Sequence, residues 1–119
     1  MPAGIDSGEL LMRLLRAAEL RSRAVASNIA NLNTPGYRRL EVRFEDELLR
    51  AMERGGDRAA TLEPRLVEDE LHPPRADGNN ADMELELAEL RRNRLLSDTY
   101  NALLKARFDV VRAAIDGGR

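Results

Sequence analysis

The sequence predicts a mainly α-helical protein in which two long terminal helices pack as an antiparallel coiled coil, with a loop-rich middle region. Aromatic side chains make up only 3% of the 119 residues, too few to fill a compact globular core. Charged residues reach 34%, a composition typical of long helices rich in Leu, Ala, Glu and Arg. Apolar residues also recur every three or four positions near both ends. We expect three segments, 1–37, 38–81 and 82–119, that form one domain.

The first helix is predicted from about Ser7 to Leu32, with Asp6 or Ser7 as its N-cap. Its apolar positions alternate in steps of four and three, which keeps one seam turned toward a partner helix. A surface helix packed on its own domain has the same periodicity, so this alternative stays open. The predicted interface residues of this helix are Leu11, Leu15, Ala18, Val25, Ile29 and Leu32, with Ser22 filling the one gap.

A rigid turn is expected directly after this helix, at Thr34-Pro35-Gly36-Tyr37. Proline disfavours helical geometry in the residue before it, so the helix has to stop here. In a type II turn Pro35 presets the second position, and Gly36 supplies the positive φ of the third. The turn would therefore redirect the chain away from the helix axis.

The middle region carries weaker patterns. A short helix is predicted from Phe44 to Met52, ended by Gly55-Gly56. The residues around Leu66-Val67 are compatible with a short strand. The segment 72–80 is predicted to be a loop, because Pro, Gly and Asn favour turns over helix.

The second long helix is predicted from about Asp82 to Ile115, with Asp82 as its N-cap. Two neighbouring apolar stripes give it a broad face over its last four turns or so, which indicates contact with more than one helix. At ~1.5 Å per residue the two helices would span about 39 and 51 Å, and a lone pair would leave much of that face in water. We therefore expect the terminal segments to be poorly ordered in the free monomer and to become helical on assembly. The predicted interface residues here are Leu90, Leu104, Phe108, Val111 and Ile115.

Composition gives no sign of catalysis, cofactors or metal. The formal net charge is −2, which gives no general reason to expect nucleic acid or an anionic membrane as a partner. No small-molecule substrate is expected either. The chain has no cysteine, and its single histidine, His72, precedes two prolines without a set of further ligands. The acidic clusters at 68–70 and 84–89 are interpreted as solvated charge and as partners of a helix dipole. No segment has the pattern of a cleaved signal peptide or the length of a membrane span.

One segment is far more specific than these patterns. Residues 27–37 match S-N-I-A-N-x-x-T-P-G-[YF], and the chain thereby resembles the bacterial flagellar rod and hook proteins. The segment 77–84 further resembles the D-G-N-x-V-D-[LM]-[DE] pattern of proximal rod subunits, with Ala81 in place of Val, and Asn93 matches an Asn common in the helix that follows. The motif residues are Ser27, Asn28, Ile29, Ala30, Asn31, Thr34, Pro35, Gly36 and Tyr37.

The resemblance implies a structural subunit of the flagellar basal body, whose terminal helices build a hollow rod that transmits torque from motor to hook. It also implies type III export without signal cleavage. The expected partners are copies of the chain, other rod proteins, the basal-body adaptor and the export gate. Two alternatives stay open: another axial subunit of the rod and hook family, or a soluble helical-hairpin adaptor or export chaperone.

Overall fold

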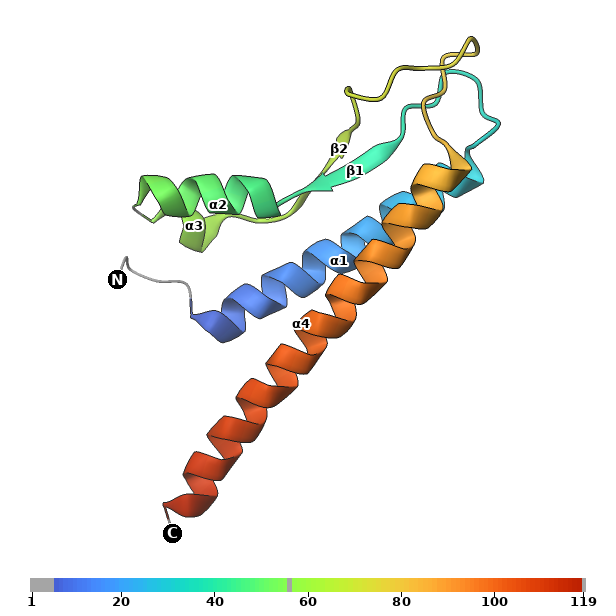
Figure 1. Cartoon of the computed structure of the whole chain (residues 1–119). Helices are drawn as coiled ribbons and strands as arrows, with labels where there is room; N and C mark the ends of the chain where they lie inside the picture. The colour runs from blue at the N-terminus through green and yellow to red at the C-terminus, as the bar shows by residue number, and fades with distance from the viewer. Residues whose placement is uncertain (1–5, 56, 119) are drawn as a thin grey trace.

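A computed structural model describes residues 6–55 and 57–118 of the chain. It confirms a mainly helical fold with a long helix at each end and a smaller hairpin between them (Figure 1). The elements in chain order are α1 (Ser7–Ala30), β1 (Leu40–Arg43), α2 (Glu45–Arg54), α3 (Arg58–Thr61), β2 (Arg65–Glu68) and α4 (Met83–Gly117).

The two long helices lie side by side and run in opposite directions (Figure 1). The first begins at its predicted cap, where the Asp6 carboxylate accepts a hydrogen bond from the backbone N–H of Glu9 at 3.4 Å. It ends at Ala30, two residues before the predicted end. The second is capped by Asp82, whose carboxylate accepts from the Leu85 N–H at 3.2 Å. It continues two residues past its predicted end, to Gly117.

The middle region is more ordered than the sequence indicates. The short helix is present as α2, and the strand around Leu66-Val67 is present as β2. This strand pairs antiparallel with β1, with Leu40 opposite Glu68 and Arg43 opposite Arg65. Neither strand β1 nor α3, a single helical turn, is predicted by the sequence patterns. Between the two strands, α2 and α3 form the tip of a hairpin, and the predicted loop at 72–80 leads from β2 to α4 (Figure 1).

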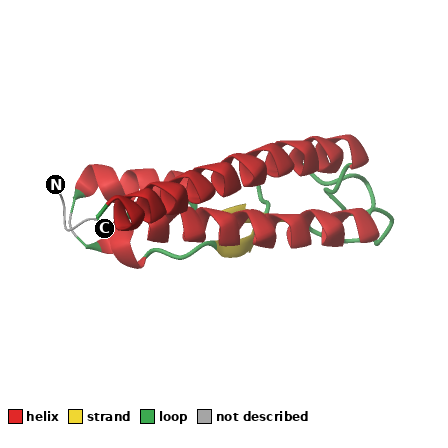
Figure 2. Cartoon of the chain, turned by 90° about the horizontal axis from the view of Figure 1, so that it is seen from below, coloured by secondary structure: helices red, strands yellow, loops and turns green. Residues whose placement is uncertain are grey.

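The largest apolar cluster lies between α1 and this hairpin, on a side of α1 that the predicted seam does not include. Phe44 and Leu48 pack with Ala17 of α1, and Leu10 and Leu14 cover them in part. The first helix therefore has two contact faces, one for the hairpin and one for α4. Seen from below, the helices run along one long axis (Figure 2), and the described chain measures 66 × 30 × 14 Å. None of its described helices has the length and apolar content required to span a membrane.

Candidate assembly site

The family motif forms a hydrogen-bonded corner at the end of α1. Asn28 is fully buried, and its side-chain oxygen accepts from the Tyr37 hydroxyl at 2.8 Å and from the Leu40 N–H at 2.7 Å. Its amide nitrogen donates to the Leu40 carbonyl at 2.9 Å. Because the Tyr37 proton is used on Asn28, the hydroxyl of Ser27 donates to the Tyr37 oxygen at 2.9 Å. These bonds fix the course of the chain from α1 into β1.

The turn has the geometry that the sequence predicts. The N–H of Tyr37 donates to the Thr34 carbonyl at 3.2 Å, and Gly36 has a φ of +75°. These are the hydrogen bond and the positive φ of a type II turn. Asn31 and Thr34 reinforce it, because the Thr34 hydroxyl donates to the Asn31 side chain at 3.0 Å. Pro35 is exposed at the outside of the turn.

Residues 77–84, the second segment that resembles the rod proteins, pack directly against this turn. The Gly36 N–H donates to the Asp77 carbonyl at 2.8 Å. Gly78, with a φ of +85°, lies so close that a Cβ atom built on it would be 3.2 Å from the Cα of Gly36. The fully buried Asn79 donates through its amide to the carbonyls of Asn31 and Thr34 at 2.8 and 2.9 Å. This side chain therefore ties the C-cap residue of α1, Asn31, to Thr34 at the start of the turn.

A buried ion-pair network continues from this corner. The guanidinium of Arg39 donates to Glu86 at 2.7 Å and to Asp69 at 2.6 Å, and all three residues are at most 5% exposed. Glu86 also accepts from Asn28 at 2.9 Å. The interpretation of Asp69 and Glu86 as solvated charges is therefore wrong: both are buried, and each is compensated by Arg39. The sequence contains one indication that Glu86 is buried: it lies seven residues before Asn93, and therefore on the same face of α4.

Hydrogen bonds hold Arg39 and Asp69 in their charged forms. Burial alone would raise the pKa of the Asp69 carboxyl. Hydrogen bonds from Arg39, from the backbone N–H groups of Leu71 and His72 and from the His72 ring lower this pKa instead, to about 2. Burial would likewise lower the pKa of the Arg39 guanidinium, but its bonds to Glu86 and Asp69 raise that pKa above its ordinary value. Arg39 and Asp69 therefore stay ionised over the whole physiological range.

A second polar contact fixes α4 against α1 farther along the helices. The buried Asn93 donates to the Ala18 carbonyl at 2.8 Å and to the Ser22 hydroxyl at 2.9 Å. Its oxygen accepts from Arg21 at 3.2 Å. Ser22, the polar gap in the predicted apolar seam, is thus the place where Asn93 docks. Such polar contacts favour one register of two helices over others.

The predicted interface residues divide by exposure into a group that is buried or partly buried and a group that is exposed. On α1, Ala18 and Val25 are buried, Leu11, Leu15 and Ile29 are partly buried, and the motif residue Ala30 is exposed. Leu32 lies just past the end of α1 and is also partly buried. On α4, Leu104 is partly buried. The remaining four are exposed by 39–65% of their surface: Leu90, Phe108, Val111 and Ile115.

The last ten residues of α4 project past the start of α1. Arg107 marks the level at which α1 begins, because it donates to the Asp6 carboxylate at 2.7 Å and to the Ser7 hydroxyl. From Phe108 to Gly117 every residue of α4 is exposed. Figure 1 shows this end of α4 extending beyond the start of α1. This projecting end carries large apolar side chains at spacings of one to four residues: Phe108, Val110, Val111 and Ile115. Below, the projecting end means residues 108–117.

Among residues 6–55 and 57–118, no three His, Asp or Glu side chains come together as a metal site would require. His72 contacts the Asp69 carboxylate at 2.5 Å, and Asp69 is already engaged by Arg39. A rigid polar corner and a bare apolar helix end instead define a helical subunit of a larger assembly.

Comparison with known proteins identifies the assembly. A family model described as "Flagella basal body rod protein" matches residues 15–38, the end of α1 and the turn. The flagellar basal body rod protein FlgB of Cereibacter sphaeroides is 33% identical, over 96% of this chain and 93% of the relative. FlgB of Borrelia hermsii is 30% identical, over 92% and 95%. FlgB of Escherichia coli K12 is 31% identical, over 63% and 67%. The chain belongs to the FlgB family of flagellar basal body rod proteins.

Proposed function

We propose that this chain is a non-catalytic structural subunit of the flagellar basal-body rod. Its terminal helices would pack with those of neighbouring subunits into a hollow shaft that transmits torque from motor to hook. The observation that carries the proposal is the projecting end of α4, an apolar helix surface that residues 6–55 and 57–118 leave uncovered. Membership of the FlgB family supports the same reading.

The same proposal includes the partners and the location. The chain would assemble in the basal body with copies of itself, with other rod proteins, and with the basal-body adaptor and export gate. It would reach that place through the type III export apparatus, without cleavage of a signal peptide. The motif corner would set the angle at which the hairpin leaves the helical layer, since Asn28 and Tyr37 fix the chain direction there.

The decisive experiment expresses the chain in its own bacterium after deletion of the chromosomal copy. We expect wild type to restore swimming and to cofractionate with purified basal bodies. Val111→Asp should abolish both, because it places a charge on the proposed helix–helix interface. Leu95→Asp is the matched control: Leu95 is also an apolar residue of α4 and is 69% exposed, but it is not among the predicted interface residues. Equal behaviour of the two variants would contradict the assignment of the interface.

Gly36→Val tests the turn in the same strain. A β-branched residue resists the φ of +75° found at Gly36, although no atom lies within 4 Å of the place of its Cβ. We expect loss of incorporation and of motility. Normal swimming would count against a role of the turn in the rod. A helical adaptor or chaperone, the competing function, predicts a stable monomer or dimer that never enters basal bodies.

A further inference from the structure

The small sheet of the hairpin leaves one edge of β2 open. Within the part of the chain that the structure describes, this sheet contains only β1 and β2. Opposite residues of an antiparallel pair alternately bond to one another and turn their backbone groups outward. The Asp69 N–H donates to the carbonyl of Arg39, its opposite residue, at 2.9 Å, which fixes the phase of this alternation. The N–H and C=O groups of Leu66 and Glu68 therefore point away from β1.

The outer edge of β1, by contrast, is closed by α1. Leu40, the residue opposite Glu68, also turns its backbone groups outward. There Asn28 accepts from the Leu40 N–H at 2.7 Å and donates to the Leu40 carbonyl at 2.9 Å. No hydrogen bond among the described residues holds the outward groups of Leu66 and Glu68 in this way. Unpaired backbone groups on an edge strand are a template for a further strand.

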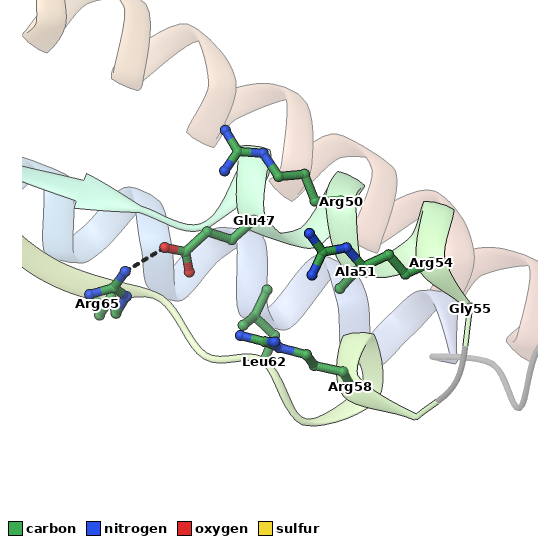
Figure 3. Close-up of a pocket in the computed structure, with 8 residues that line it drawn as sticks. All are labelled: Glu47, Arg50, Ala51, Arg54, Gly55, Arg58, Leu62 and Arg65. Carbon is green, nitrogen blue, oxygen red and sulfur yellow. Dashed lines mark hydrogen bonds and ion pairs between the residues drawn. The ribbon is translucent and has the colours of Figure 1, made fainter.

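The open edge of β2 is short and held in place. Pro64 precedes it, and proline has no N–H with which to extend the pairing. At the start of the strand, Arg65 donates to Glu47 of α2 at 2.6 Å (Figure 3). The edge is therefore limited to the backbone groups of Leu66 and Glu68, on a strand that α2 helps to fix.

The side chains of Leu66 and Glu68 lie on one face of the sheet and specify what could lie beside them. Leu66 is 44% exposed, and Val42, its opposite residue, packs partly buried against the apolar cluster. Glu68 is exposed, and no basic group of the described residues lies within 4.0 Å of its carboxylate. A strand beside β2 should therefore place an apolar residue next to Leu66 and a basic residue next to Glu68.

A second copy of β2 does not meet this requirement. In antiparallel pairing of two such edges, outward-facing residues meet outward-facing residues. Leu66 beside Glu68 sets an apolar side chain against an acid, and Glu68 beside Glu68 sets two acids together. Leu66 beside Leu66 places Glu68 opposite Pro64, which has no N–H to donate. The edge therefore suits a strand of different sequence.

We propose that the outer edge of β2 binds an extended segment of a different polypeptide as a third, antiparallel strand. Along that segment a basic residue lies beside Glu68, and an apolar residue two positions later lies beside Leu66. Backbone hydrogen bonds provide affinity, and these two side chains provide specificity. The inference goes beyond the proposed function and does not depend on it, because it concerns the hairpin rather than the terminal helices.

A synthetic peptide tests the edge on the purified full chain. The probe is capped Thr-Thr-Lys-Thr-Val-Thr-Thr, added at saturating concentration to isotope-labelled protein. Amide hydrogen exchange followed by NMR should slow by at least about tenfold at Leu66 and Glu68, because their N–H groups gain acceptors. The N–H of Val67 should change little, since it already bonds to β1. A peptide with Glu in place of Lys should bind about tenfold more weakly or worse, because it meets Glu68.

Variants of the chain separate the edge from the fold. Glu68→Lys should reverse the preference, so that the Glu peptide binds better than the Lys peptide. Leu66→Pro should lose binding of both, because it removes an outward N–H and no bond of the β1–β2 ladder. Glu53→Lys is the matched control, an exposed carboxylate of α2 without an ion pair among the described residues, and should bind like wild type. Thermal melts identify misfolded variants, and Glu68→Lys suffices should Leu66→Pro melt early. Unchanged exchange at Leu66 and Glu68, or an unchanged preference in Glu68→Lys, would overturn the inference.

Photocrosslinking in the native bacterium tests the nature of the partner. Benzoylphenylalanine in place of Leu66 should form an adduct with a different polypeptide, at a segment in which a basic residue precedes an apolar one by two positions. Glu68→Lys should reduce that adduct by at least about tenfold. An adduct with a second copy of this chain alone would overturn the inference. Loss of the wild-type chain from basal bodies would overturn the proposed function and leave the peptide result unaffected.

Discussion

The two ends of α4 differ in what their side chains contact. Near its start, Glu86 and Asn93 are buried and hydrogen-bonded to α1 and to the motif corner. In the projecting end, Phe108 and Ile115 are 62% and 65% exposed. Polar contacts of fixed geometry thus define one arrangement within the chain, whereas the apolar surface is exposed and is the one that we propose for assembly. Substitutions in the first part should therefore change the stability of the chain, and substitutions in the second should change its assembly.

The largest effect on folding is expected from Arg39→Ala. This substitution leaves Glu86 and Asp69 buried without their cation, which costs roughly 3–5 kcal/mol. Urea unfolding of the purified chain, followed by circular dichroism, measures the loss. Arg38→Ala is the control, since this neighbouring arginine is exposed and should change stability by no more than about 0.5 kcal/mol. Equal losses for the two arginines would contradict the buried network.

A smaller loss is expected from Gly78→Ala. A φ of +85° costs an L-residue about 1–2 kcal/mol, and the new Cβ would lie 3.2 Å from the backbone of Gly36. Gly36→Ala is the matched control, because its φ of +75° carries the same strain with no atom within 4 Å. The difference between the two free energies of unfolding isolates the close approach of the two family segments. No difference would show that the turn and the loop can separate without cost.

Acid should remove the contribution of Asp69. Its folded pKa of about 2 lies below the ordinary value of 3.8, so the carboxylate stabilises the fold above the unfolded pKa. This stabilisation is lost as pH falls from about 4 toward 2, and it amounts to on the order of 2 kcal/mol. Urea unfolding at a series of pH values should show that slope in wild type. Asp69→Asn should be less stable at neutral pH and should lose that part of the slope; an unchanged slope would contradict the ionised pair.

The sequence predicts a structural feature well when the residues that determine it are neighbours in the chain. The long helices and the turn follow from neighbouring residues, so spacing and Pro35-Gly36 predicted them correctly. Strand β1 pairs with residues 22 to 28 positions away, and four residues offer too little pattern to show it. Composition likewise does not distinguish a solvated carboxylate from a buried one. The roles of Asp69 and Glu86 appear only once Arg39 is placed between them.

The smallest effect on folding is expected in the projecting end. Phe108→Ala should leave the free energy of unfolding of the isolated chain within about 0.5 kcal/mol of wild type, because the ring contacts mainly solvent. Leu48→Ala is the contrast, since Leu48 is buried in the cluster between α1 and the hairpin and should lose about 2–5 kcal/mol. In basal bodies Phe108→Ala should nevertheless weaken incorporation, because the proposed helix–helix interface would bury the aromatic ring against a neighbour. A stability loss for Phe108→Ala comparable to that of Leu48→Ala would mean that the projecting end folds back onto its own chain, and the division between the two ends of α4 would fail.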